Sequence, residues 1–190
     1  GGFRSDLTVM RLGEDHFRVV TGGAHGMADR KWFLDQLVDD GVTTLTDLTN
    51  DIATIGLWGP RARDVVQALS GDDFSNENFK YFRAKRVWIA GVPVTAMRLS
   101  YVGELGWELH MPTEQAISVL DVLLDAGPDL GVTLAGTMAM NSLRIEKGYR
   151  AWGAELSTEI TSGFTLARTP GRSFSAHLAL STIASQQSFT

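Results

Sequence analysis

One stretch of the sequence places a phenol and a carboxylate where they could hold a ligand. The apolar run 94–101 predicts a strand, residues 107–111 predict a second, and a loop bracketed by glycines joins them. If the two strands pair directly across this loop, Tyr101 lies opposite Glu108 and both side chains leave the same face of the sheet. The pair predicts a ligand clamp. Taken alone, a tyrosine hydroxyl that satisfies a half-buried glutamate explains it more simply.

A cationic side chain follows about forty residues later. Residues 137–147 predict a helix that ends at Gly148, with Ala139 and Leu143 on its apolar stripe. Arg144 lies one helical step from that stripe, so its guanidinium could turn inward toward a site. The alternative is an arginine whose stem covers the core while its charged end stays in water.

Strand pairs that alternate with helices would position these side chains. The pattern predicts strands at 7–12, 17–21, 43–49, 52–58, 81–90, 92–101 and 107–111, and helices at 26–40, 62–69, 113–126 and 137–147. This order predicts an α+β domain with helices packed on antiparallel sheet. No G-x-G-x-x-G follows a strand and no G-K-S/T occurs, which argues against a Rossmann dinucleotide site and against a P-loop.

Composition narrows the classes of partner. The 190 residues suffice for one ordinary domain with a substantial core, and the net charge of −5 makes nucleic acid or anionic lipid an unsuitable partner. No apolar run approaches membrane-spanning length, and the absence of cysteine removes disulfides and thiolate nucleophiles. The four histidines lack metal-ligand spacing, so no metal site is expected; His16 is expected in a turn and His25 at a helix N-cap.

Several ordered motifs together resemble a known family. The hairpin SYVGELGWEL and the later segment LRIEKGYRAWG are similar to the folate-binding domain of the glycine-cleavage T-protein (aminomethyltransferase) family. Their wording is closest to the branch found in the C-terminal region of dimethylglycine and sarcosine dehydrogenases. The opening GGFRSDLTV and the middle LWGPRAR fit the same family, so the resemblance covers most of residues 1–161.

The resemblance implies ferredoxin-like modules of antiparallel sheet with packed helices, as an incomplete T-protein-type fold. It implies tetrahydrofolate as cofactor and an enzymatic role: transfer of a methylene or aminomethyl unit, from an N-methylated amine or iminium intermediate, to tetrahydrofolate. A flavin dehydrogenase domain, fused or as a partner, would generate that unit, and FAD is expected only in such a missing N-terminal domain. The expected location is the cytoplasm, or the mitochondrial matrix in a eukaryote.

The resemblance also suggests roles for individual side chains. The pterin edge offers two adjacent N–H donors that suit a carboxylate, so Glu108 is the candidate acceptor, with Tyr101 beside it and Arg144 nearby. Trp152 could form an aromatic wall for the pterin. Asp6 matches the aspartate after the family's Gly-Gly motif and is the candidate general base. From sequence alone, a turn aspartate that caps backbone amides is the favoured explanation of Asp6.

The end of the chain departs from the family wording. We expect residues 1–161 to form the folate-binding domain and residues 162–190 to be a divergent, poorly ordered tail, because this tail is rich in Ser, Thr and Ala and has no acidic residue. Gly1 lies inside a motif, so a fragment without its N-terminal part is expected. Two further alternatives stay open: a non-catalytic folate-binding or channelling module, and an inactive fragment.

Overall fold

The chain folds into two units, each with its own sheet. The structure is a computed structural model that describes residues 2–159, 179–183 and 187–189. The first unit, named the N-terminal unit, contains the described residues up to Ile52 together with 150–159 and 187–189. What we call the central unit contains residues 53–149 and 179–183.

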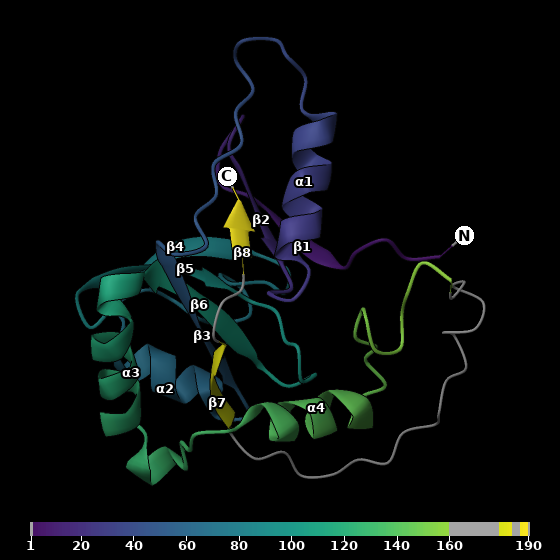
Figure 1. The fold of residues 1–190 in the computed structure, drawn as a ribbon. Coiled ribbons are helices and arrows are strands. Elements are labelled where there is room, and N and C mark those ends of the chain that lie inside the picture. Colours follow the sequence, from purple (N-terminus) through teal and green to yellow (C-terminus); the bar gives the residue numbers. More distant parts are fainter. Residues whose placement is uncertain (1, 160–178, 184–186, 190) are drawn as a thin grey trace. The chain divides into compact units, whose positions relative to one another are not determined.

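The N-terminal unit is built on a hairpin. Strands β1 (Leu7–Arg11) and β2 (Phe17–Thr21) pair antiparallel, and β8 (Gln187–Phe189) adds to β2. Helix α1 (Gly26–Gln36) lies beside this hairpin (Figure 1). The hairpin and its turn confirm the prediction, and His25 occupies the predicted N-cap position of α1, although its side chain makes no capping hydrogen bond.

The segment after α1 differs from the prediction. The helix ends at Gln36 rather than near residue 40, and residues 43–49 do not form the predicted strand. Asp40 accepts hydrogen bonds from the backbone amides of Val42 and Thr43, and Asp47 accepts one from the amide of Thr49. Local side-chain bonds of this kind compete with a strand ladder for backbone donors. β-branched composition alone was therefore misleading here.

The central unit contains a five-stranded sheet. Its strands are β3 (Ile52–Trp58), β4 (Ala84–Ile89), β5 (Val92–Met97), β6 (Gly106–Pro112) and β7 (Ala179–Ile183), in the order β4-β5-β6-β3-β7. A two-residue turn joins β4 to β5: Ala90 and Gly91 have φ angles of 46° and 84°. Positive φ at both central residues is typical of the turns that match the twist of a hairpin.

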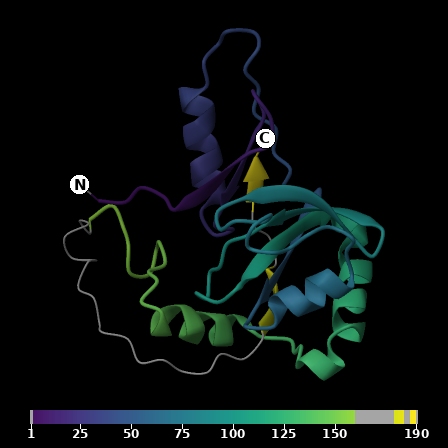
Figure 2. The same ribbon diagram turned by 180° about the vertical axis from the view of Figure 1, so that it is seen from behind.

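Two of the helices of this unit pack on one face of the sheet. The helical elements are α2 (Ala62–Ala68), the short 3₁₀ turns η1 (Thr113–Gln115) and η2 (Pro128–Leu130), α3 (Ala116–Asp125) and α4 (Thr137–Glu146). The apolar core joins α2 and α3 to strands β3 to β6. Helix α2 lies behind the sheet in Figure 1 and in front of it in Figure 2. The predicted α+β class, with helices packed on antiparallel sheet, is confirmed.

Strand β6 separates two environments. Trp107, Leu109 and Met111 are fully buried in the apolar core under α2 and α3. Because successive side chains of a strand point to opposite faces, Glu108 and His110 lie on the other face of the sheet. Core packing therefore fixes the direction in which the candidate carboxylate points.

Parts of the predicted tail form strands. Residues 179–183 are β7, paired antiparallel with β3, and residues 187–189 are β8. The remainder of the segment 162–190 lies outside the described residues. The boundary at 161 and the poor order of the tail as a whole stay predictions.

Candidate functional site

Glu108 is a buried carboxylate on the face of β6 that points away from the apolar core. Only 4% of its surface is exposed. An ionised carboxylate is costly to bury unless polar or cationic groups surround it. The structure should therefore place a polar partner against Glu108.

That partner is His110, which lies two residues further along β6 and therefore on the same face of the sheet. Its Nε2 atom lies 3.3 Å from Oε2 of Glu108, and its Nδ1 atom lies 3.1 Å from the hydroxyl oxygen of Thr54 on β3. All three residues are 5% exposed or less. We refer to them as the Glu108–His110–Thr54 chain.

The contact between His110 and Glu108 is close but poorly aligned. The 3.3 Å separation is an ion-pair distance. Even so, Nε2 has no hydrogen bond of acceptable geometry to a described residue. We take the short distance as the more informative fact, because the terminal torsion of a glutamate is broad and a modest rotation of the carboxylate would align the two groups. His110 and Glu108 are thus in electrostatic contact.

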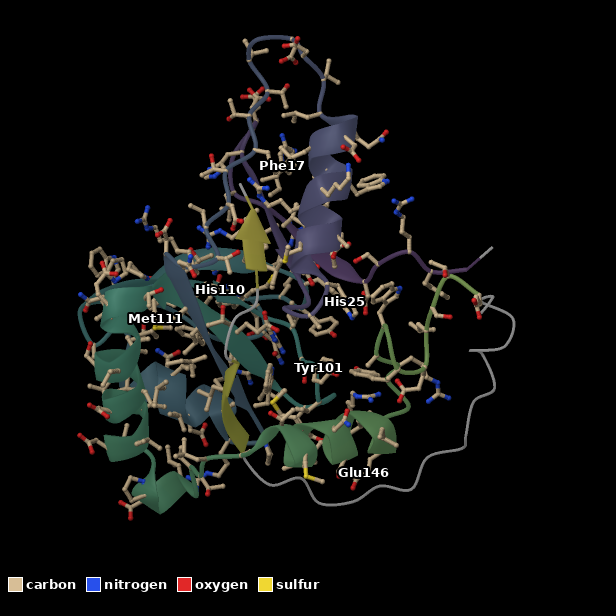
Figure 3. The ribbon with its side chains drawn as sticks, viewed as in Figure 1. Phe17, His25, Tyr101, His110, Met111 and Glu146 are labelled. Atoms are coloured by element: carbon tan, nitrogen blue, oxygen red, sulfur yellow. The ribbon has the colours of Figure 1, made fainter. Side chains whose placement is uncertain are left out.

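The predicted pairing of Tyr101 with Glu108 is wrong. Strand β5 ends at Met97, and in the observed register Met97 is the residue opposite Glu108. Tyr101 instead lies in the loop before β6 and is 37% exposed (Figure 3). The connection between the two strands runs over residues 98–105, longer than the predicted loop, and this moves every cross-strand pair because register follows loop length.

The loop that carries Tyr101 is held at several points. The amide of Glu104 donates to the Ser100 hydroxyl at 2.9 Å, and the Glu104 carboxylate pairs with Lys147 at 2.7 Å. Gly103 has a φ angle of 74°, and a β-carbon there would lie 2.4 Å from the Lys147 side chain. The loop is therefore ordered, and Tyr101 is presented from a defined backbone.

Arg144 turns inward, as one of the two alternatives predicted. It is 2% exposed, although it lies near the end of α4. Its Nε atom donates to Oδ1 of Asn141 at 2.6 Å, and Nη1 donates to the carbonyl of Tyr149 at 2.9 Å. The alternative in which the charged end stays in water is excluded. These bonds also tie the chain after Gly148 back onto the helix.

Asp6 precedes β1 in the N-terminal unit, and its environment differs from that of a capping aspartate. Among the residues that the structure describes, none donates a hydrogen bond to its carboxylate. Burial raises the pKa of Asp6. The residue as a whole remains exposed by surface area, so solvent screens its charge and the pKa shift corresponds to a small free energy. A capping aspartate accepts amide hydrogen bonds that lower its pKa. The turn-cap explanation of Asp6 is therefore not supported.

A second carboxylate of the same unit has the structural role instead. Asp29 on α1 is 7% exposed, and its Oδ2 atom accepts hydrogen bonds from the hydroxyls of Ser5, at 2.8 Å, and Thr21. These bonds join α1 to β2 and to the segment just before Asp6. This cluster could not be predicted from the sequence, because the three residues share no spacing pattern.

Trp152 lies in the N-terminal unit, and its indole ring packs in an edge-to-face arrangement with a neighbouring ring. Its Nε1 atom donates to the Phe3 carbonyl at 2.9 Å, and the His25 ring packs against it with centroids 4.0 Å apart. A cavity of about 400 Å³ lies beside it, lined by Arg4, Asp29 and other residues of this unit. An aromatic wall at a cavity agrees with the predicted function of Trp152, and the pterin contact itself stays a prediction.

The five predicted site residues therefore divide between the units. Tyr101, Glu108 and Arg144 belong to the central unit, and Asp6 and Trp152 to the N-terminal unit. Within the described ranges, no group of three or more histidine or acidic side chains is placed to hold a metal ion. In that same part of the chain, no helix is long and apolar enough to cross a membrane.

The sequence contained half of the signal for the Glu108–His110–Thr54 chain. Glu108 and His110 are two apart on a predicted strand, so a shared face follows from alternation alone. Thr54 is 56 residues away from His110. Its contact could be found only after the order of strands β6 and β3 was known.

The architecture and this polar face together define the class of the protein: an α+β domain of antiparallel sheets that buries a carboxylate–imidazole pair on the face of one sheet opposite its apolar core. The sequence matches the family described as the GCVT N-terminal domain over residues 1–164. The chain belongs to this family, which confirms the resemblance drawn from its motifs.

Its relatives are aminomethyltransferases and dehydrogenases. The mitochondrial dimethylglycine dehydrogenase of Homo sapiens is 36% identical over 160 residues, which cover 84% of this chain and 18% of that protein. The mitochondrial sarcosine dehydrogenase of Homo sapiens is 38% identical, with 82% and 18% covered. An aminomethyltransferase of Caldanaerobacter subterraneus subsp. tengcongensis is 35% identical, with 85% and 42% covered. The chain thus spans less than half the length of these relatives.

A solved structure supports the fold. The heterotetrameric sarcosine oxidase from Corynebacterium sp. U-96, in complex with pyrrole 2-carboxylate, superposes with a TM-score of 0.57 and 22% sequence identity. The match covers 71% of this chain and 66% of that one. At this identity the likeness concerns the fold alone, and it agrees with the predicted T-protein-type architecture.

Proposed function

We propose that the chain binds tetrahydrofolate and transfers a one-carbon unit to it, as part of a longer protein. The observation that carries this proposal is the family match over residues 1–164, together with an aminomethyltransferase that aligns with 85% of the chain. The donor would be an N-methylated amine or the iminium derived from it. This class of donor is suggested by the names of the dimethylglycine and sarcosine dehydrogenases among the relatives.

The residues of the central unit fit the cofactor. Tetrahydrofolate, when bound, supplies the amine nitrogens that accept the carbon unit. Its pterin edge has two adjacent N–H donors, and the Glu108 carboxylate has two oxygens that can accept them. Burial strengthens such charge-assisted bonds, because little water competes for the carboxylate. Glu108 is thus the proposed acceptor, and its polar support is already in place.

The other candidates keep distinct proposed roles. Asp6 would take up or hold the proton that the attacking amine loses, and a raised pKa improves a carboxylate as a base. Tyr101 and Arg144 would contact the cofactor from the central unit. Trp152 would present its ring face to the pterin.

The oxidation that generates the carbon unit would take place elsewhere. We propose a flavin dehydrogenase, fused or as a partner, as its source, with FAD bound there. The observation that favours it is the 18% of each dehydrogenase that this chain spans, which leaves most of those proteins for other tasks. Two of these relatives are described as mitochondrial, and a mitochondrial or cytoplasmic location of this chain is a proposal as well.

Two measurements on the 190-residue chain test the proposal. In the first, calorimetric titration with tetrahydrofolate should give saturable binding, whereas aminobenzoylglutamate, which lacks the pteridine ring, should bind far more weakly. In the second, formaldehyde or an aminomethyl donor is added, and formation of the methylene derivative is followed by absorbance. Absence of tetrahydrofolate binding would contradict the proposal. Binding without turnover would identify a non-catalytic binding or channelling module instead.

A further inference from the structure

The fold does not require polar side chains at the positions of the Glu108–His110–Thr54 chain, because apolar side chains could fill the same space. The same strand fills the apolar core with Trp107, Leu109 and Met111, and the sheet is held by its backbone ladder. Three polar side chains of 5% exposure or less stand on the opposite face. Burying polar groups without full hydrogen bonding destabilises a fold. His110 Nε2 lacks a well-aligned partner among the described residues. Such a group suggests an arrangement completed when a ligand is bound.

We propose that His110 and Thr54 are positioning residues that fix the Glu108 carboxylate for recognition of the pterin edge. This inference rests on the proposed function, because it assigns the support for the same cofactor contact. The imidazole would hold one carboxylate oxygen, and the threonine hydroxyl would hold the imidazole. From the sequence, His110 had no assigned role beyond the observation that the histidines lack metal-ligand spacing, and Thr54 was not singled out.

The distances define what each group does. The Thr54 hydroxyl lies 3.1 Å from Nδ1 of His110, so it can donate its hydrogen there. A neutral imidazole that accepts at Nδ1 carries its hydrogen on Nε2, which is the atom facing Glu108 at 3.3 Å. In the tautomer in which the Thr54 hydroxyl donates to Nδ1, the imidazole can therefore donate from Nε2 to the carboxylate.

This arrangement leaves the carboxylate able to bind the cofactor. Each carboxylate oxygen accepts up to two hydrogen bonds, so Oε2 can accept from Nε2 of His110 and also from the ligand. Without the imidazole, the terminal torsion of Glu108 is free to turn. The two oxygens would then match the paired donors only part of the time, and affinity and selectivity would both fall.

Matched substitutions test the inference. His110→Gln retains an N–H donor near the position of Nε2, whereas His110→Leu removes it. Thr54→Ser keeps the hydroxyl, whereas Thr54→Val keeps the shape and removes the hydroxyl. Thr95→Val is the control, because Thr95 lies directly across from His110 in the β5–β6 register but has no recorded hydrogen bond to its ring. All are made in the full 190-residue chain, with thermal melts recorded for each.

The readout is the dissociation constant for tetrahydrofolate and for its analogue without the pterin 2-amino group. We expect His110→Leu to weaken tetrahydrofolate binding by about tenfold and Thr54→Val by about threefold, the scale of one lost hydrogen bond. Discrimination against the analogue should shrink with them. Gln, Ser and the Thr95 control should stay within about twofold of the parent, since each retains the donor or hydroxyl in question.

The outcomes separate this inference from the proposed function. If the parent chain does not bind tetrahydrofolate, the proposed function fails and takes the inference with it. If the parent binds and both His110→Leu and Thr54→Val retain its affinity and discrimination, the inference alone is overturned. Should His110→Leu fail to fold, the Thr54 pair decides, because valine is isosteric with threonine and the loss of discrimination is measured within one folded protein.

Discussion

At the scale of single residues, the aspartates of this chain show two opposite environments. Hydrogen bonds lower the pKa of Asp40 to about 2, first from the Thr43 hydroxyl and then from the backbone amides of Thr43 and Val42. Burial raises the pKa of Asp6. A side chain that organises a turn is stabilised as an anion, and a base benefits from the opposite shift. The direction of the Asp6 shift is thus the one that a base would need, and its catalytic role stays a prediction.

The Asn variant of Asp6 separates catalysis from structure. Because the Asp6 pKa is raised on folding, its contribution to stability is present below the unfolded pKa and is lost as the pH rises through the folded value. At pH 7 the charge is thus slightly unfavourable, and Asp6→Asn should melt no lower than the parent. In a complete parent protein, one-carbon transfer should fall by about 10²-fold or more, the scale of a lost general base, while tetrahydrofolate binding changes little. Single-turnover rates and calorimetry measure the two effects.

A turn aspartate would behave in the opposite way. Its replacement would lower the free energy of unfolding by about 1 kcal/mol and leave turnover per folded molecule intact. Parental transfer rates in Asp6→Asn would therefore remove Asp6 from the catalytic machinery.

The sequence identified single side chains better than their pairings. Helical spacing allowed the inward turn of Arg144 as one of two alternatives, and strand alternation placed Glu108 on a defined face; the structure shows both side chains buried. The pairing of Tyr101 with Glu108 depended on register, and register depends on where each strand ends. The contact of Thr54 with His110 depended on strand order. Neither quantity is encoded in local periodicity.

At the scale of elements, glycines determine how β6 meets β3. A β-carbon at Gly106 would lie 2.0 Å from the Leu57 carbonyl oxygen and 2.6 Å from Cδ1 of Trp58. One at Gly56 would lie 2.3 Å from the Trp58 ring. The indole of Trp58, fully buried, donates to the Leu99 carbonyl at 2.9 Å, so it joins the sheet to the loop that carries Tyr101. The two glycines provide the space that this indole occupies.

Substitution of Gly106 should therefore destabilise the central unit. Gly106→Ala forces backbone or indole to move, and overpacking of this kind costs about 1–3 kcal/mol. Each kcal/mol corresponds to about 2–4 °C in melting temperature for a chain of this size. Gly71→Ala is the control, because a β-carbon there meets no atom within 4 Å. Equal melting temperatures for the two variants would contradict the close contact between β6 and β3.

The loop after α1 offers a prediction about pH. A depressed pKa means that Asp40 contributes stability above its unfolded pKa and that this contribution is lost as the pH falls through about 2. The largest cause is the Thr43 hydroxyl, so Thr43→Val should raise the titration midpoint of the Asp40 carboxyl. The midpoint is measured by NMR of the labelled aspartate side chain. An identical midpoint in the variant would show that the hydroxyl bond is absent in solution.

The same loop shows where element prediction failed. Residues 43–49 have the β-branched composition of a strand, but Asp40 and Asp47 divert the neighbouring amides into local hydrogen bonds. The helix at α3 and the turn between β4 and β5 were predicted well, because breaker and turn signals agree there with apolar periodicity, whereas the far end of β5 was placed too late.

At the scale of the whole molecule, the chain corresponds to one part of its longer relatives. It belongs to the GCVT N-terminal domain family and spans 42% of an aminomethyltransferase and 18% of two dehydrogenases. The α+β class was predictable from the order of elements. The five-stranded order β4-β5-β6-β3-β7 was not, because β7 comes from a segment predicted to be tail. Long-range pairing of that kind leaves no local signal.

The central claim is that Glu108 receives the pterin edge, and one comparison of dissociation constants tests it. Glu108→Gln keeps the shape but removes the charge, so tetrahydrofolate should bind about tenfold to a hundredfold more weakly, the scale of a charge-assisted hydrogen bond. Glu104→Gln is the matched control, because Glu104 lies four residues earlier in the loop, pairs with Lys147 at 2.7 Å and is not part of the Glu108–His110–Thr54 chain. It should stay within about twofold of the parent. Equal affinities for the two variants would contradict the account.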